Sequence, residues 1–272
     1  MSRQLFEGAA LRLIPWQHRS LIWALVLREI GSRYRSSVIG WAWSVITPLF
    51  TLAVYTLVFK NVFSVKWTGG DGTSVEFAVL IFIGMTVFGF FSECVTRAPL
   101  LITSNVNYVK KIVFPLEILP WVSLGVAAFH ALVSLMVLLV FYALVVGLPH
   151  WTAVLYPLVM APLLLLTMGL SWIFSAVGVY FRDMGHIIGS LLLPLMFLTP
   201  IFYPISALPA QLRGVIGLNP LASVIENARL VLYWGQVPEL MPLFAEIVAT
   251  GIFAFVGLCF FQKSREGFAD VL

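Results

Sequence analysis

Long apolar segments separated by short charged ones dominate the chain. The sharpest boundary lies at residues 28–48, where Arg28, Arg33 and Arg35 precede an uncharged stretch that continues to Phe59. An α-helix needs about 20 apolar residues to cross the hydrocarbon core of a bilayer, so this stretch predicts a membrane span. Its arginine-rich side is expected in the cytoplasm, because Lys and Arg close to spans are retained there during insertion.

The same pattern predicts six spans. No charged residue lies between Glu117 and Arg182, which is too long for one helix, and the turn-forming residues 147–150 divide this region into two spans joined by a hairpin. The predicted spans are 38–60, 77–96, 118–147, 152–180, 186–204 and 239–262. The expected fold class is an all-α integral membrane protein with one transmembrane domain over residues 1–272. Residues 1–37 form its cytoplasmic or interfacial segment, and 263–272 form its tail.

Basic residues set the predicted orientation. With both termini in the cytoplasm, twelve Lys and Arg residues lie inside and four outside, as insertion favours. The inner set is Arg3, Arg12, Arg19, Arg28, Arg33, Arg35, Arg97, Lys110, Lys111, Arg182, Lys263 and Arg265, and the outer set is Lys60, Lys66, Arg213 and Arg229.

Two segments depart from simple spans. Residues 205–238 are apolar but broken by proline and glycine, and they begin and end on the same face. A re-entrant outer hairpin satisfies both facts if protein buries the break between its helices, and an outer loop lying on the surface is the alternative. From Gln17 onward, aliphatic and basic residues alternate in a way that predicts an amphipathic interfacial helix.

Composition narrows the function classes. A chain that is 61% hydrophobic and 10% charged cannot cover its surface with polar groups as a soluble domain does. The net charge of +4 is gathered near the span ends, so no nucleic-acid partner is expected. Cys94 and Cys259 lie far apart in apolar segments, which argues against a disulfide. Paired carboxylates and a His-rich set are both missing, so we expect no catalytic residue and no metal site.

The chain also lacks an energy source of its own. It has no Gly-x-x-x-x-Gly-Lys-Ser/Thr loop, and none of its lysines follows a glycine, so it is not a P-loop ATPase. Glu93 and Arg97 lie one helical turn apart at the inner end of the second span, and His130 lies deep in the third. For His130 a hydrogen-bonded contact between helices is favoured over proton transfer, so ion-coupled transport is not expected.

Four motifs occur in order along the chain. They are residues 33–43 (RYRSSVIGWAW) followed by Thr47-Pro48, 105–115 (NVNYVKKIVFP), 180–183 (YFRD), and 199–204 (TPIFYP) leading to Asn219-Pro220. Together they resemble the permease subunits of type-2 ABC exporters for bacterial polysaccharides, over about Arg28 to Arg229. That family often has two adjacent tryptophans after the glycine, whereas Ala42 separates Trp41 from Trp43 here.

The resemblance implies a homodimer in the bacterial inner membrane, paired with two copies of a separate P-loop ATPase. ATP and Mg are then bound by that partner, and this chain has no cofactor. The implied substrate is a lipid-linked polysaccharide such as O-antigen or capsule. An ABC permease for drugs or small lipids is the alternative, and the Arg-Tyr-Arg opening and the 14% aromatic content favour the glycan.

Coupling to such a motor needs cytoplasmic segments that carry both charges and apolar anchors. The predicted ATPase-coupling residues are Arg28, Arg33, Arg35, Asn107, Tyr108, Lys110, Lys111, Arg182 and Asp183. Phospholipid anchoring is an equal and compatible interpretation for the three N-terminal arginines. A helix-capping role is favoured for Asp183.

A sugar chain needs a wide passage in which aromatic rings can stack on pyranose faces. The predicted lining is Trp41, Trp43, Tyr55, Phe59, Phe88 and Phe91, and the predicted outer gate is Pro200, Tyr203, Asn219 and Pro220. Counted at ~100 degrees per residue, positions 41, 55 and 59 lie within about 40 degrees of one helical face. Contact with lipid is the alternative for each aromatic residue taken singly.

Overall fold

The structure is a computed structural model that describes residues 15–35, 37–62, 73–109 and 114–272. The all-helical expectation is confirmed, and no strand occurs among these residues. The longer helices are α2 (Arg19–Arg35), α3 (Trp43–Val62), α4 (Ser74–Arg97), α6 (Leu119–Val145), α7 (Tyr156–Tyr180), α8 (Met184–Leu198), α10 (Pro220–Arg229) and α11 (Leu240–Arg265). The shorter ones are α5 (Val106–Val109), α9 (Ala210–Gly217) and α12 (Phe268–Val271).

Five segments within the described residues are long and apolar enough to cross a membrane. They are Gly40–Leu57, Ser74–Leu100, Leu116–Val145, Trp151–Tyr180 and Leu240–Arg265. The predicted fifth span, 186–204, corresponds to α8, which is apolar but has only 15 residues. It ends at Leu198 because the backbone becomes extended at Thr199, just before Pro200.

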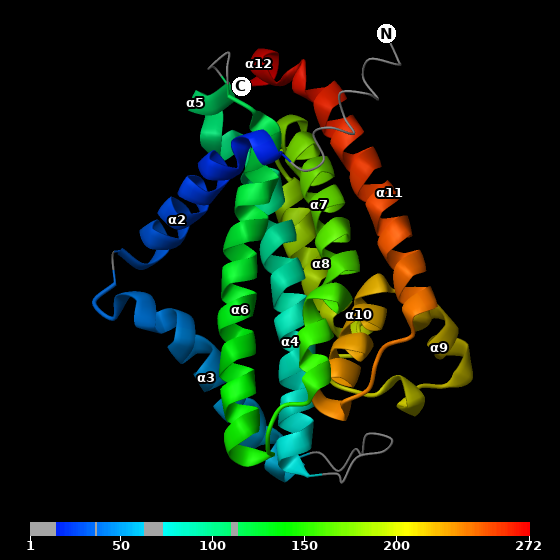
Figure 1. Ribbon diagram of the computed structural model, residues 1–272. Coiled ribbons are helices and arrows are strands. Elements are labelled where there is room, and N and C mark those ends of the chain that lie inside the picture. The colour runs from blue at the N-terminus through cyan, green and yellow to red at the C-terminus, as the bar shows by residue number, and fades with distance from the viewer. Residues whose placement is uncertain (1–14, 36, 63–72, 110–113) are drawn as a thin grey trace.

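Helix α4 is the centre of the bundle (Figure 1). In the best membrane-spanning window of its segment, 78% of the residues are buried, compared with 6% in the window that contains most of α3. The side chains of α4 are apolar on all sides of the helix, as expected for a helix that is enclosed by other helices. Helix α3 diverges from the bundle in Figure 1, so most of its surface is available to lipid or to another subunit.

Helix α2 packs obliquely on α6 through its buried side. Leu25, Val26 and Ile30 contact a cluster that includes Val122 and Val126 of α6. Gly125 permits this approach, because a Cβ atom there would lie 2.7 Å from a methyl group of Val26. The N-terminal helix is therefore part of the folded domain.

Small residues bring α7 and α11 together. A Cβ atom on Gly257 would lie 2.6 Å from the carbonyl oxygen of Gly169, so the two backbones are nearly in contact. The opposite side of α11 is exposed and apolar. Its exposed side chains recur at every fourth position, at Phe244, Val248, Ile252, Val256 and Phe260.

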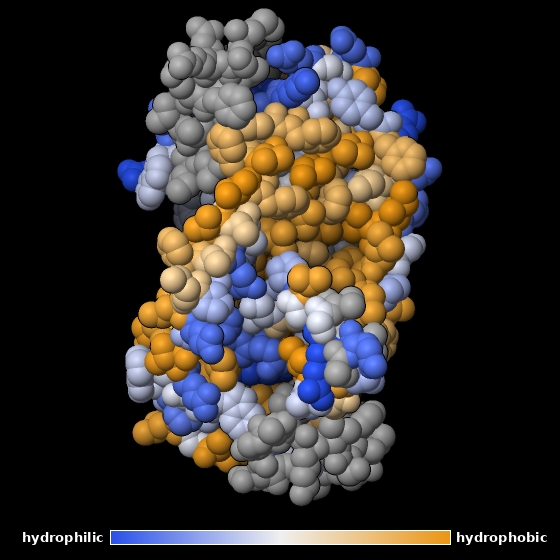
Figure 2. Space-filling view, turned by 90° about the vertical axis from the view of Figure 1, so that its right-hand side faces the viewer, coloured by the Kyte–Doolittle hydropathy of each residue, from blue (hydrophilic) through white to orange (hydrophobic). Residues whose placement is uncertain are grey.

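Figure 2 shows a broad apolar surface on the side of the molecule that includes α11, with hydrophilic residues gathered towards its two ends. An apolar belt bounded by polar ends is the surface that a lipid bilayer requires. The described helices therefore form an integral membrane domain.

A fully buried arginine organises the turn after α8. Arg229, at the end of α10, donates to the carbonyl oxygens of Pro200 (2.8 Å), Ile201 (2.8 Å) and Leu80 (3.2 Å). It also forms an ion pair of 2.6 Å with Glu226. Carbonyl groups freed where a helix ends are costly in an apolar setting unless they accept a hydrogen bond.

Asn219 connects the start of α10 to the same turn. Its Oδ1 accepts from the backbone N–H of Leu221 (3.0 Å), as an N-cap residue does, and its Nδ2 donates to the Thr199 hydroxyl (3.1 Å). Pro220 follows at the first helical position, where its missing N–H has no cost. Tyr203 donates to the carbonyl oxygen of Phe197 (2.9 Å). Pro200 and Tyr203 thus lie in the turn after α8, and Asn219 and Pro220 at the start of α10 are joined to that turn through Thr199.

Arg229→Met is expected to lower the free energy of unfolding by about 3–5 kcal/mol, because it leaves Glu226 and the buried carbonyl groups without their cation. Thermal unfolding of the purified protein in detergent measures this effect. Arg213→Met is the matched control, because Arg213 also donates to two backbone carbonyls but is exposed. Its effect should stay within about 0.5 kcal/mol. Equal losses in the two variants would contradict the role given to Arg229.

Candidate functional site

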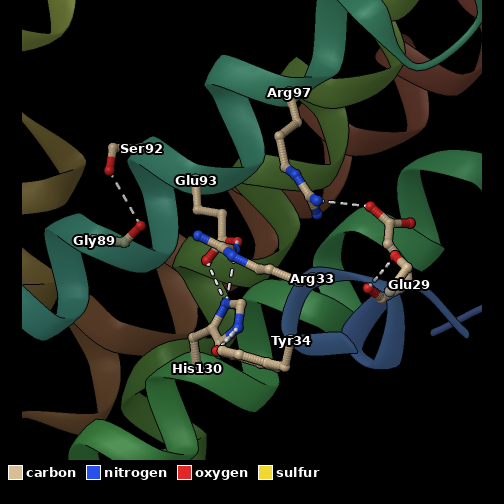
Figure 3. Close-up of polar contacts among 9 residues, drawn as sticks. Glu29, Arg33, Tyr34, Gly89, Ser92, Glu93, Arg97 and His130 are labelled. Carbon is tan, nitrogen blue, oxygen red and sulfur yellow. Dashed lines mark hydrogen bonds and ion pairs between the residues drawn. The ribbon is translucent and has the colours of Figure 1, made fainter. Parts of the chain in front are cut away.

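A network of charged and polar side chains joins α2 to α4 and α6 (Figure 3). Arg33 of α2 forms an ion pair of 2.6 Å with Glu93 of α4. The other side of the Glu93 carboxylate lies 2.8 Å from Nδ1 of His130 on α6, and Nε2 of His130 lies 3.1 Å from the hydroxyl of Tyr34. Three helices therefore meet at one carboxylate.

The hydrogen-bond partners in this network indicate which of its atoms carry a proton. A carboxylate only accepts, so Nδ1 of His130 carries a proton, and in the neutral ring Nε2 is then an acceptor. Burial raises the pKa of Tyr34 above its usual value, although the charge of Arg33 opposes this shift. Tyr34 thus keeps its proton near neutral pH, and its hydroxyl donates a hydrogen bond to Nε2 when the His130 ring is neutral. The expected contact of His130 with another helix is confirmed.

A second ion pair lies one turn further along the same two helices. Glu29 of α2 and Arg97 of α4 are 2.7 Å apart (Figure 3). The pairs 29/33 and 93/97 are both separated by four residues, which places each pair on one face of its helix. Each helix carries Glu before Arg along its sequence, and the two helices run antiparallel here. In this register each Glu therefore faces an Arg of the other helix. This spacing was visible in the sequence, but the partner of each charge was not.

Apart from Arg33, which pairs with Glu93, the predicted coupling residues fall into three groups. Arg28 donates to the Tyr108 hydroxyl (3.1 Å), and the Tyr108 ring stacks on Phe114 at 4.2 Å, so these residues connect α2 to the segment after α4. Arg35, the last residue of α2, is exposed, as are Asn107 in α5 and Arg182 and Asp183 between α7 and α8. Lys110 and Lys111 lie outside the described residues.

Asp183 does not have the side-chain role that the sequence favoured. It occupies the N-cap position of α8, but its side chain makes no capping hydrogen bond. Its backbone has helical angles there, whereas a side-chain cap normally needs an extended residue. The exposed carboxylate is left on the molecular surface.

The predicted lining aromatics lie in different environments. Trp41 and Trp43 are 53% and 42% exposed, and Tyr55 is half-buried against the core. Phe88 and Phe91 are both buried inside the single chain, with ring centres 6.2 Å apart. The side chain of Phe59 lies outside the described residues. A role in a sugar passage stays a prediction for all six.

The junction before α3 also differs from the predicted continuous helix. Residues Gly40–Ala42 form a 3-10 turn, and α3 begins only at Trp43. Gly40 has a φ of 57°, a left-handed conformation that glycine adopts without strain. Trp41 is held there by Tyr34 (5.6 Å between ring centres) and Phe129 (6.0 Å), so its direction does not follow the α-helical count.

A pocket of about 220 Å³ lies between α3, α4 and α6, next to this network. Its polar lining is Thr47, Thr51, Thr86, Glu93, His130 and Ser134. The hydroxyls of Thr51 and Thr86 donate to carbonyl oxygens one turn earlier in their own helices. Their lone pairs remain able to accept weak hydrogen bonds, which suits a passing hydroxyl-rich molecule or water.

Comparison with known proteins places the chain in a family. The model of the ABC-2 type transporter family matches residues 20–233. The chain is 29% identical to an O-antigen export system permease protein of Myxococcus xanthus, over 94% of this chain and 96% of the relative. It is 28% identical to a protein of the same description from Klebsiella pneumoniae, over 93% and 95%.

A third relative is a polysialic acid transport protein of Escherichia coli, 26% identical over 89% of this chain and 93% of the relative. The family model includes α2, the ion-pair network and the turn held by Arg229 in one continuous match. The chain therefore belongs to the ABC-2 type transporter family.

Proposed function

We propose that this chain is the membrane subunit of an ATP-driven exporter that carries a lipid-linked polysaccharide across the cytoplasmic membrane. The observation that carries this proposal is the match, over nearly the full length, to permeases named for O-antigen export and polysialic acid transport. ATP and Mg are bound by a separate P-loop ATPase, because the chain has no phosphate-binding loop. Two copies of each chain form the transporter.

We also propose that both termini face the cytoplasm and that α8 completes a sixth crossing. In Figure 1 the C-terminus, α5, and the start of α2 lie at one end of the molecule, and α9 and α10 lie towards the other. The excess of basic residues belongs to the first end. The hydrogen bonds of Arg229 support a hairpin that dips into the membrane, since they satisfy the backbone where α8 stops.

Helix α2 is the proposed coupling element. It lies at the cytoplasmic end and continues through Gly40 into α3, so a push on α2 from the ATPase is transmitted to the most exposed span. The two ion pairs to α4 keep α2 in one register while it is pushed. Arg35, Asn107, Arg182 and Asp183 are exposed at this end and are available to contact the ATPase.

The proposed passage lies on the exposed side of α3, where a second copy of the chain supplies the facing wall. Trp41 and Trp43 are the best-placed aromatic residues, because both are exposed at the cytoplasmic start of this helix. Exposed rings can stack on the apolar faces of sugar rings without holding them by charge. An export passage requires such weak contacts.

Reconstitution with the ATPase tests the proposed function. We expect the purified chain to bring down a P-loop ATPase, and ATP hydrolysis by the complex in proteoliposomes to rise several-fold with lipid-linked polysaccharide. Amphipathic drugs and short lipids serve as the comparison, because they are the substrates of the alternative permease class. Stimulation by these compounds, with no response to the glycan, would overturn the proposal.

Glu93→Gln is expected to reduce ATP-dependent glycan transport at least threefold, because a half-exposed ion pair is worth on the order of 0.5–1 kcal/mol and His130 exchanges a charged acceptor for a neutral amide oxygen. Glu239→Gln removes an exposed carboxylate elsewhere and serves as the control. In a double-mutant cycle with Arg33→Gln, the two losses should not add, since both changes break one contact. Strict additivity would contradict the network.

Trp41→Ala is expected to lower glycan transport about threefold or more, since an aromatic contact contributes about 0.5–1.5 kcal/mol. Trp151→Ala is the control, because Trp151 is 70% exposed but lies at the opposite end of α7 from the coupling elements. Protein levels measured by immunoblotting separate lost transport from lost protein. Unchanged transport with normal levels would remove Trp41 from the passage.

A further inference from the structure

A second pocket, of about 260 Å³, lies at the inner end of α4. It is bounded by α2, by the segment that follows α4, and by the start of α6. Its polar lining is Arg28, Glu29, Arg97, Ser104, Asn105 and Tyr108. The rest of the lining is aliphatic and includes Leu25 of α2 and Val122 of α6, which belong to one apolar cluster. One pocket thus combines a polar wall with an apolar floor.

The charges in this pocket do not balance. Two guanidinium groups, from Arg28 and Arg97, face a single carboxylate, Glu29. Nη2 of Arg97 pairs with Glu29 at 2.7 Å, whereas its Nη1 is buried and has no hydrogen-bond partner among the described residues. Arg28 has a hydrogen bond from Nη1 to Tyr108, which leaves its remaining donors available. The excess of positive charge and the remaining donors of Arg28 suit an anion in this pocket.

The position of the pocket relative to the membrane indicates which anions can reach it. Arg97 is the last residue of α4 and lies within the membrane-spanning segment Ser74–Leu100, so its guanidinium is at the depth of lipid headgroups. Trp23 of α2 (64%) and Trp16 in the 3-10 turn before it (70%) are exposed, and tryptophan is enriched at this depth. Phosphate groups of the inner leaflet are therefore the nearest anions.

We propose that this pocket binds the phosphate group of an anionic membrane lipid. The phosphate oxygens accept hydrogen bonds from Arg97 and Arg28, since a guanidinium matches the geometry of phosphate. The glycerol and the first carbons of the acyl chains lie against Leu25 and Val122. The lipid thereby joins α2 to the end of α4 beside the Glu29 ion pair. This site is additional to the glycan passage and does not depend on the proposed transport activity.

Lipid binding to the purified full-length chain tests the site. The probe is dihexanoyl phosphatidylglycerol below its critical micelle concentration, titrated into delipidated protein in detergent by calorimetry. Arg97→Gln should weaken binding about tenfold or more, as expected for the loss of a charged donor. Glu29→Gln should bind as tightly as the wild type or more tightly. Both variants break the same ion pair, so the loss of that pair affects them equally. A difference in lipid affinity between them therefore reports a direct contact of the Arg97 cation with the lipid.

Two further variants and two further ligands complete the test. Arg97→Lys should weaken binding less than Arg97→Gln does, because it keeps the charge but loses the guanidinium fork. Arg28→Gln, at an exposed position, should also weaken binding, and it serves as the test if Arg97→Gln does not fold. Equal weakening by Arg97→Gln and Glu29→Gln would overturn the proposal, because the ion pair would then act only structurally. If dihexanoylglycerol bound as tightly as dihexanoyl phosphatidylglycerol, the proposed phosphate contact would be wrong. If inorganic phosphate bound as tightly as this lipid, the proposed contact with the rest of the lipid would be wrong. No saturable binding of the lipid would also overturn it, and would leave an acidic side chain of the ATPase as the occupant.

Discussion

The need to satisfy backbone carbonyl groups inside an apolar bundle constrains this structure most. Helix α8 stops at Leu198, after 15 residues, and the backbone turns there, although a helix that crosses a bilayer of ordinary thickness needs about 20 residues. That turn is possible because Arg229 reaches the carbonyl oxygens of Pro200 and Ile201 from the end of α10. Gly84 of α4 leaves room for it, since a Cβ atom there would lie 3.3 Å from the guanidinium. This contact joins the end of α10 to α4 and to the turn after α8.

Near the other end of the molecule, ion pairs hold α2 in place against α4. Glu29 and Arg33 of α2 meet Arg97 and Glu93 of α4, and His130 brings α6 to the same carboxylate. A shift of α2 by one helical turn would bring like charges together. The ion pairs therefore specify one register for a helix whose apolar contacts alone would allow several. Since α2 leads directly into α3, that register also positions the start of the first span.

The two ends support one mechanical picture of export. The buried turn near Arg229 is held by several hydrogen bonds and is rigid, whereas the Arg33 side chain is 52% exposed and its ion pair can be exchanged for water at modest cost. In the proposed transporter, α2 and α3 are therefore the helices that we expect to move. In α3, whose best window is only 6% buried, few contacts within the chain resist such motion.

The sequence by itself determined the all-helical membrane class, five of the span positions, the break near Pro200 and the absence of a phosphate-binding loop, because hydrophobic length and local chain chemistry decide these features. It also favoured a hydrogen-bonded role for His130, which is confirmed. Only the structure showed that α8 is by itself too short to cross a membrane and that the Asp183 side chain does not cap it. It also showed that Arg229 is buried and does not lie in an exposed outer loop. Contacts such as Arg229 with Leu80 join residues far apart in the chain. Which charge meets which carbonyl or carboxylate depends on how helices pack, and no local pattern records that packing.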